Sequence, residues 1–222
     1  RVSRSAAFNG AAACAGCHQF SFGDDERRAT PLAMQRTVDE HADSPDREKS
    51  CAECHMPRTT RGHRSHAFAS TRSQENLRGS IVARARLLSP TSVRIELASS
   101  GVGHAFPTGD LFRRLAVRAE VASDDGRVLA GKTRYLARHF ATGRDRFDQP
   151  IREELFDDRL VPGEVSVVDL ELGARALERP VRWSVSLERV LHVADHEEAS
   201  AVVDSAVELA DGEIGPTKEP AD

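Results

Sequence analysis

The pattern of apolar and polar residues changes near residue 79. From there onward, short stretches alternate apolar and charged side chains, which is typical of β-strands with one face on a core. These stretches cover residues 80–88, 92–99, 112–123, 127–140, 164–172 and 181–192, with a weaker one at 201–209. Turn-forming residues such as Asp124-Asp125-Gly126 separate neighbouring stretches. Short strands joined by turns predict an antiparallel β-sandwich of the immunoglobulin-like kind.

Residues 1–78 show no regular period of apolar residues and contain few of them. We expect short helical pieces around Ala29–His41 and at the cysteine motifs described below, with Pro45 and Pro57 near helix ends. A segment with so little apolar content makes a poor core alone. The sequence therefore predicts an α+β protein with a small irregular, partly helical region and a β-sandwich domain. Their expected limits are 1–78 and 79–211, with a charged connection at 141–163 and a mobile tail at 212–222.

Charge and length exclude some classes of protein. The 222 residues carry a formal net charge of -4, with 31 Lys and Arg against 35 Asp and Glu. This near balance argues against binding to nucleic acid. No apolar run reaches the roughly 18 residues of a membrane-spanning helix, so we expect no direct membrane span. The chain starts at Arg1, and we interpret it as a mature product from which any signal peptide has been removed.

All four cysteines lie in two copies of Cys-x-x-Cys-His, CAGCH at 14–18 and CAECH at 51–55. In c-type cytochromes the two cysteines of this motif form thioether bonds to a haem, and the histidine becomes an axial iron ligand. The motifs predict two covalently bound haem c groups. Cys14, Cys17 and His18 would hold the first haem, and Cys51, Cys54 and His55 would hold the second. Each haem would also supply the apolar interior that residues 1–78 lack.

Three other uses of the cysteines compete with haem attachment. They are a four-cysteine zinc site, a pair of disulfides and a redox dithiol. Each leaves the position of His18 and His55 unexplained, so we favour haem attachment. Because such attachment occurs outside the bacterial cytoplasm, we expect a periplasmic or extracellular protein.

Two histidines are the main candidates for the distal side of the iron atoms. His66 lies eleven residues after His55, in a loop long enough to reach over a haem. His104 lies in GVGHAFPTGD, where glycines permit close backbone approach and Pro107 stiffens the bend. Lower-ranked candidates are His41, Met34 and His63. The remaining histidines, His139, His192 and His196, lie on or beside predicted strands, and we interpret them as packing or solvent-facing residues.

Taken in order, CAGCHQF, MQRTVDEHADSP, CAECHMPRTTRGHRSHAF and GHAFPTGDLFRRL resemble the C-terminal part of bacterial multihaem c-type cytochromes. Members of that family often carry further Cys-x-x-Cys-His motifs upstream, whereas this chain has two. The resemblance implies electron transfer outside the cytoplasm, with His104 as a distal haem ligand. It makes His66 the matching second candidate.

We therefore predict electron transfer by a dihaem c-type cytochrome with low-spin, bis-histidine haems. Its partners would be redox proteins, such as further multihaem cytochromes or a membrane complex. One alternative is a haem enzyme with an open iron, of the peroxidase or nitrogen-oxide reductase type, although no catalytic residues stand out. Another is an electron-relay subunit whose β-domain docks onto a larger cytochrome complex or a filament.

Overall fold

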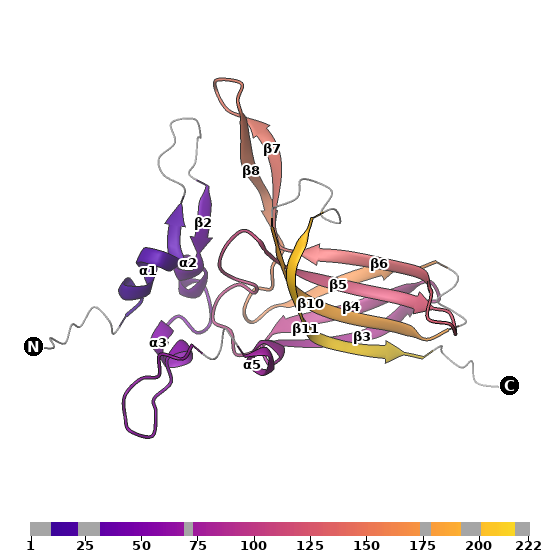
Figure 1. Ribbon diagram of the computed structural model, residues 1–222, viewed down its shortest axis with the longest axis horizontal. Helices are drawn as coiled ribbons and strands as arrows, with labels where there is room; N and C mark the ends of the chain where they lie inside the picture. The colour runs from indigo at the N-terminus through magenta and orange to yellow at the C-terminus, as the bar shows by residue number, and fades with distance from the viewer. Residues whose placement is uncertain (1–9, 22–31, 69–72, 174–178, 192–200, 216–222) are drawn as a thin grey trace, which may run out of the picture.

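The computed structural model describes residues 10–21, 32–68, 73–173, 179–191 and 201–215. A small N-terminal region of short elements lies beside a larger β-region (Figure 1). The small region contains α1 (Ala12–His18), β1 (Gln19–Ser21), β2 (Ala33–Arg36), α2 (Thr37–Ala42) and α3 (Cys51–His55). Strands β1 and β2 pair antiparallel.

The helices expected at the two cysteine motifs are confirmed as α1 and α3. The helix expected around 29–41 is only partly correct, because Ala33–Arg36 forms a strand and the helix begins at Thr37. Residues 29–31 of that prediction lie outside the described residues. Pairing of β2 with β1 keeps the first half of this segment extended.

Two antiparallel sheets form the larger region. The first has the strand order β11-β10-β5-β6, with β5 (Arg113–Ala122), β6 (Val128–Leu136), β10 (Val181–Val190) and β11 (Val203–Ile214). The second has the order β3-β4-β9, with β3 (Ile81–Ser89), β4 (Ser92–Ser99) and β9 (Val165–Glu171). The short helix α5 (Gln74–Arg78) leads into β3. The strands expected from the alternating pattern are therefore present.

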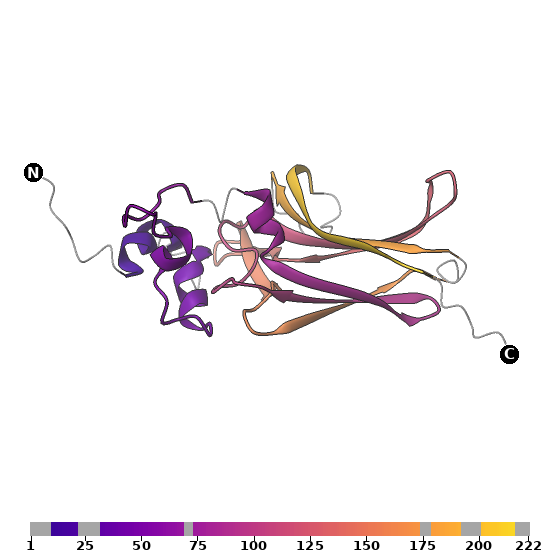
Figure 2. The ribbon, with the colours of Figure 1, turned by 90° about the horizontal axis from the view of Figure 1, so that it is seen from below.

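The two sheets lie in separate layers (Figure 2) and share one apolar core. Fully buried residues of β4, such as Ile95 and Leu97, belong to the same cluster as Leu115 and Val117 of β5 and Val185 of β10. Alternation explains this arrangement, since residues two apart on a strand point to the same face. Each such aliphatic side chain contributes about 1.5–3 kcal/mol when it leaves water.

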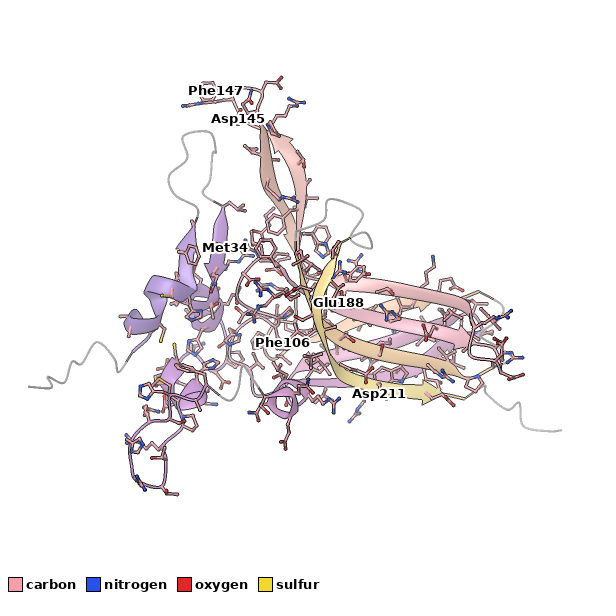
Figure 3. All side chains as sticks on the ribbon, viewed as in Figure 1. Met34, Phe106, Asp145, Phe147, Glu188 and Asp211 are labelled. Carbon is pink, nitrogen blue, oxygen red and sulfur yellow. The ribbon has the colours of Figure 1, made fainter. Side chains whose placement is uncertain are left out.

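The charged connection expected at 141–163 is wrong over most of its length. Strands β7 (Arg138–Arg144) and β8 (Pro150–Asp157) pair antiparallel and form a hairpin that projects from the sheets (Figure 1). Asp145 and Phe147 lie at its tip (Figure 3). This hairpin was missed because charged residues interrupt the alternation that marks a half-buried strand.

The last strand is longer than its pattern suggested. Strand β11 continues through Ile214, which pairs with Val181 of β10, so residues 212–214 of the expected tail are part of the sheet. Residues 216–222 lie outside the described residues. Asp211 and Glu213 hid the alternation in the sequence, because they are charged residues in the closing part of the strand. Within the residues that the structure describes, no helix has both the length and the apolar character to cross a membrane.

Candidate haem-binding site

Each Cys-x-x-Cys-His motif forms a short helix that ends at its histidine. Residues three apart lie on one face of a helix, so each helix carries its two thiols on the same side. Cys14 and Cys51 are half-buried, whereas Cys17 and Cys54 are exposed. All four are free thiols in the structure, so the disulfide alternative finds no support in it.

The two motifs come together at Cys14 and Cys51. Burial raises the pKa of the Cys51 thiol, and the neighbouring Cys14 thiol, which shares a hydrogen bond with it, raises this pKa further. A reactive dithiol needs a lowered thiol pKa, so this environment does not favour the redox alternative. In the part of the chain that the structure describes, no three His, Cys, Asp or Glu side chains gather as a metal-binding group. The four-cysteine zinc site therefore finds no support.

His18 is oriented by neighbours on the next elements. Its Nδ1 lies 3.1 Å from Oε1 of Gln35 on β2, an amide oxygen that accepts a hydrogen bond. The next residue, Gln19, accepts from the backbone N–H groups of Val38 and Asp39 at the start of α2. When Nδ1 donates to such an acceptor, Nε2 is left with the lone pair that binds a metal. The hydrogen bond to Gln35 thus leaves Nε2 of the exposed His18 as the ring atom that could bind a metal.

The helix that carries His55 is fixed at both ends. At its start, the backbone N–H of Ser50 donates to Oε2 of Glu53 over 2.5 Å. At its end, Nη1 of Arg64 donates to the carbonyl oxygens of Ala52 and Met56, over 2.6 and 3.1 Å. The carbonyl of Ala52 also accepts from the backbone N–H of Met56, and a cation at the end of a helix interacts favourably with the helix dipole.

His104 reaches the small region from the turn that joins β4 to β5. Gly101 and Gly109 have positive φ angles of 64° and 108°, which glycine adopts without strain. A Cβ added to Gly103 would lie 3.0 Å from Cβ of Asp46, so any larger residue would push that segment away by a few tenths of an ångström, and glycine permits the closest approach. The close approach and positive φ angles expected of these glycines are confirmed.

The structure brings together His55 and His104, which the sequence places far apart. Their ring centroids lie 6.1 Å apart and the ring planes differ by 5°. Nδ1 of His104 lies 3.0 Å from the carbonyl oxygen of Ala105. Because a carbonyl can only accept, Nδ1 carries the hydrogen and Nε2 keeps its lone pair. Burial lowers the pKa of both histidines, which favours the neutral, metal-binding form.

These residues fit a haem iron. A metal–imidazole bond is about 2 Å long, and the bonding nitrogen lies about 1.1 Å from the centre of its ring. Two imidazoles that bind one metal from opposite sides therefore have ring centres roughly 6 Å apart. The observed 6.1 Å agrees with that value. Within the described part of residues 10–68, the buried residues are Leu32 and Ser44. The small region therefore has almost no apolar core of its own, and large apolar groups would supply one.

The other predicted ligands lie elsewhere in the same region. His63 and His66 are exposed in the loop after α3. His41 is half-buried on α2, with ring Cδ2 3.4 Å from where a Cβ on Gly103 would be. Met34 is half-buried on β2 (Figure 3). The structure describes no arrangement of any of these four with His18 like that of His104 with His55, so their roles as iron ligands stay predictions.

The histidines interpreted as packing residues are partly described. His139 is buried, with Nε2 2.7 Å from Oδ1 of Asp158 and its ring stacked on Phe156 at 4.2 Å. His192 and His196 lie outside the described residues. Residues that the sequence reasoning missed are Gln35 and Arg64, described above, and Glu40 and Arg159, described below. Nothing in the sequence pattern singles them out, since each acts through a contact between separate elements.

No protein-family model matches the sequence, and no curated protein matches it. The structure is similar to the crystal structure of a penta-heme cytochrome c552 from Thermochromatium tepidum, with a TM-score of 0.66 and 21% sequence identity. The match covers 94% of this chain and 56% of that one, so the chain spans little more than half of its structural relative. The likeness shows that the two proteins share a fold.

Proposed function

We propose that this chain transfers electrons as a c-type cytochrome unit with two covalently bound haem c groups, in the periplasm or outside the cell. The observation that carries the proposal is the near-parallel approach of His55 and His104 at 6.1 Å. The two side chains come from separate regions, and both are neutral and half-buried. Such a pair is suited to opposite sides of one iron, and the fold shared with a penta-heme cytochrome supports the same function.

Each residue of the site has a defined role in this proposal. Cys14 and Cys17 attach the first haem and Cys51 and Cys54 attach the second, with His18 and His55 as the proximal iron ligands. When bound, each haem supplies a one-electron redox centre whose potential depends on ligand identity, burial and nearby hydrogen bonds. His104 is the distal ligand opposite His55.

For the distal ligand opposite His18, we propose a residue of the small region. His66 remains the first candidate, followed by His41, Met34 and His63. Ligation of both irons by two protein side chains gives low-spin centres that pass electrons without binding substrate. The contact between Cys14 and Cys51 supports exchange between the two haems, because it keeps the attachment helices adjacent.

The β-region supports the site as a rigid holder of the His104 turn. One sheet contains β3, β4 and β9, and the other contains β5, β6, β10 and β11. When the β7–β8 hairpin is left out, the first sheet thus takes the first, second and fifth strands in chain order, and the second sheet takes the remaining four. This distribution supports an immunoglobulin-like sandwich. The structural relative is a penta-heme cytochrome, and we propose that the electron partners of this chain are further multihaem cytochromes or another redox protein.

The test begins with the visible spectrum and haem content of the protein made in a host that matures c-type cytochromes. We expect two haems per chain by the pyridine haemochrome assay and a low-spin oxidised spectrum. Material without haem would overturn the proposed function. A high-spin wild-type spectrum with rapid cyanide binding would favour the haem-enzyme alternative.

Replacement of the distal ligand tests the assignment of His104. We expect His104→Ala to keep both haems attached and to convert one of them to a high-spin or water-ligated state, because one iron loses its sixth ligand. His139→Ala is the matched control, a buried histidine of the β-region outside the site, and it should leave the spectrum low-spin. A fully low-spin His104→Ala protein would show that His104 is not a ligand.

A further inference from the structure

A buried polar contact holds the His104 turn against α2. Oγ1 of Thr108, four residues after His104, donates to Oε2 of Glu40 over 2.8 Å. The same hydroxyl lies 2.8 Å from Oγ1 of Thr37, at the start of α2. The turn is therefore joined to α2 through one side chain that is itself part of the β4–β5 connection.

Arg159 binds both Glu40 and the backbone of the same turn. Its Nη2 donates to Oε1 of Glu40 over 2.6 Å, and its Nη1 donates to the carbonyl oxygen of Pro107 over 3.0 Å. Its Nε and Nη2 also bind Asp157 over 2.9 and 2.7 Å. The side chains of Glu40 and Arg159 are only 9% and 4% exposed. Both carboxylate oxygens of Glu40 thus bind groups that flank the same turn.

The hydrogen bonds of Glu40 join the small region to the β-region beside the His104 turn. Glu40 lies on α2, in the small region, whereas Thr108, Pro107 and Arg159 belong to the β-region. Backbone hydrogen bonds of 2.9 Å in both directions join Phe106 to Leu160 and align Arg159 with the turn. Phe106 lies where the two regions meet (Figure 3). The backbone of the turn is therefore shaped within the β-region, and Glu40 links that shape to the helices of the small region.

We infer that Glu40 is a positioning residue that holds His104 at the distance from His55 required for shared ligation of one iron. This inference rests on the proposed function. A buried carboxylate is costly unless its charge and lone pairs are satisfied, and here Arg159 and Thr108 satisfy both oxygens. Loss of the carboxylate leaves Arg159 with Asp157 and Pro107, and it reduces the hydrogen bonds of Thr108 to α2 to the one with Thr37. His104 then binds the iron only part of the time.

The test compares Glu40→Leu with the matched control Glu188→Leu. Glu188 is also buried and also pairs with a buried arginine, Arg114, at 2.8 Å, but both residues belong to the β-region, so this pair does not join the turn to α2. For Glu40→Leu we expect both haems to stay attached, a high-spin component to appear and cyanide to bind about tenfold faster, the factor that loss of one charge-assisted hydrogen bond gives. Glu188→Leu should keep the low-spin spectrum, whatever it does to the unfolding midpoint.

Two conservative variants separate positioning from folding. Glu40→Gln keeps an oxygen for Arg159 and places an N–H donor beside the Thr108 hydroxyl, so it should restore most of the low-spin spectrum. Thr108→Val keeps the shape of the side chain but removes the hydroxyl, and it should raise the high-spin fraction even if Glu40→Leu does not fold. A low-spin spectrum in both Glu40→Leu and Thr108→Val would overturn the inference. If His104→Ala nevertheless gave the high-spin form, the proposed function would stand and only the role of Glu40 would fall.

Discussion

At the residue scale, the chemistry of the site depends on which imidazole nitrogen is free. His18 and His104 each use Nδ1 in a hydrogen bond, to Gln35 and to the carbonyl of Ala105. Nε2, the atom farther from the backbone, is therefore free in both. This arrangement fixes the tautomer and the ring orientation of both histidines, and under the proposed function it would lower the cost of forming an iron bond.

Single residues also set how the interface between the two regions responds to pH. Burial alone would raise the pKa of Asp157, but hydrogen bonds and charge from Arg159, together with a hydrogen bond from Arg36, outweigh it and hold the pKa below its usual value. A lowered pKa in the folded state contributes stability above the pKa of the unfolded state, near 4. That stability is lost as the pH falls through the folded pKa.

We predict that acid weakens the protein through Asp157. The free energy of unfolding should stay level above roughly pH 4 and then fall with decreasing pH, and Asp157→Asn should make that fall shallower. Denaturant unfolding at a series of pH values measures the slope. Asp204→Asn, an exposed carboxylate on β11, is the control and should leave the slope as in the wild type. An unchanged slope in Asp157→Asn would contradict the prediction.

At the element scale, α1 and α3, which carry the two Cys-x-x-Cys-His motifs, are too short to be stable alone. Helix α1 has seven residues and α3 has five, whereas isolated helices shorter than about 12 residues are marginal in water. Contacts other than the backbone hydrogen bonds of the helix must therefore hold them. For α3 those contacts are the Ser50–Glu53 hydrogen bonds at its start and Arg64 at its end.

We predict that Arg64 stabilises α3 and so the position of His55. Arg64→Met keeps most of the aliphatic stem but removes the two hydrogen bonds to the carbonyls of Ala52 and Met56. We expect a loss of about 1 kcal/mol in the free energy of unfolding of the haem-loaded protein, measured with guanidinium chloride. Arg61→Met, in the same loop at an exposed position, should change it little. Equal effects of the two substitutions would rule out the capping role.

At the scale of the whole molecule, stability and ligand chemistry are divided between the two regions. The aliphatic core lies between the sheets, while the small region meets the β-region largely through polar contacts such as Arg138 with the carbonyl of Ala33 and Arg36 with Glu154. The β-region therefore serves as the rigid base that holds His104 in place. Unfolding of the sheets would move His104, the proposed distal ligand, away from His55.

We predict that a substitution in the core between the sheets changes ligation only through unfolding. Leu97→Ala removes a fully buried side chain and should lower the free energy of unfolding by about 2–5 kcal/mol. Fluorescence of the single tryptophan, Trp183, and the low-spin spectrum should then be lost at the same, lower denaturant concentration. Leu88→Ala, at a position 42% exposed, is the control and should leave the midpoint nearly unchanged. Loss of the low-spin spectrum well before the Trp183 signal would show that the β-region does not hold the ligand.

The sequence by itself determined the elements whose pattern is local. Alternation predicted the strands of both sheets, since one face of each strand packs on the core. The spacing of the cysteine motifs and the glycines around His104 were enough to mark those residues as candidates for the site. The β7–β8 hairpin and the end of β11 were not predicted, because charged residues there obscure the alternation on which such a prediction depends.

Only the tertiary structure decided which of these residues meet. The approach of His104 to His55, and the contacts of Glu40 with Thr108 and Arg159, join residues that lie far apart in the chain. Their meeting depends on how the packed sheets orient one turn toward the small region. Local propensity carries no information on such an orientation, because it arises from the packing of the whole core.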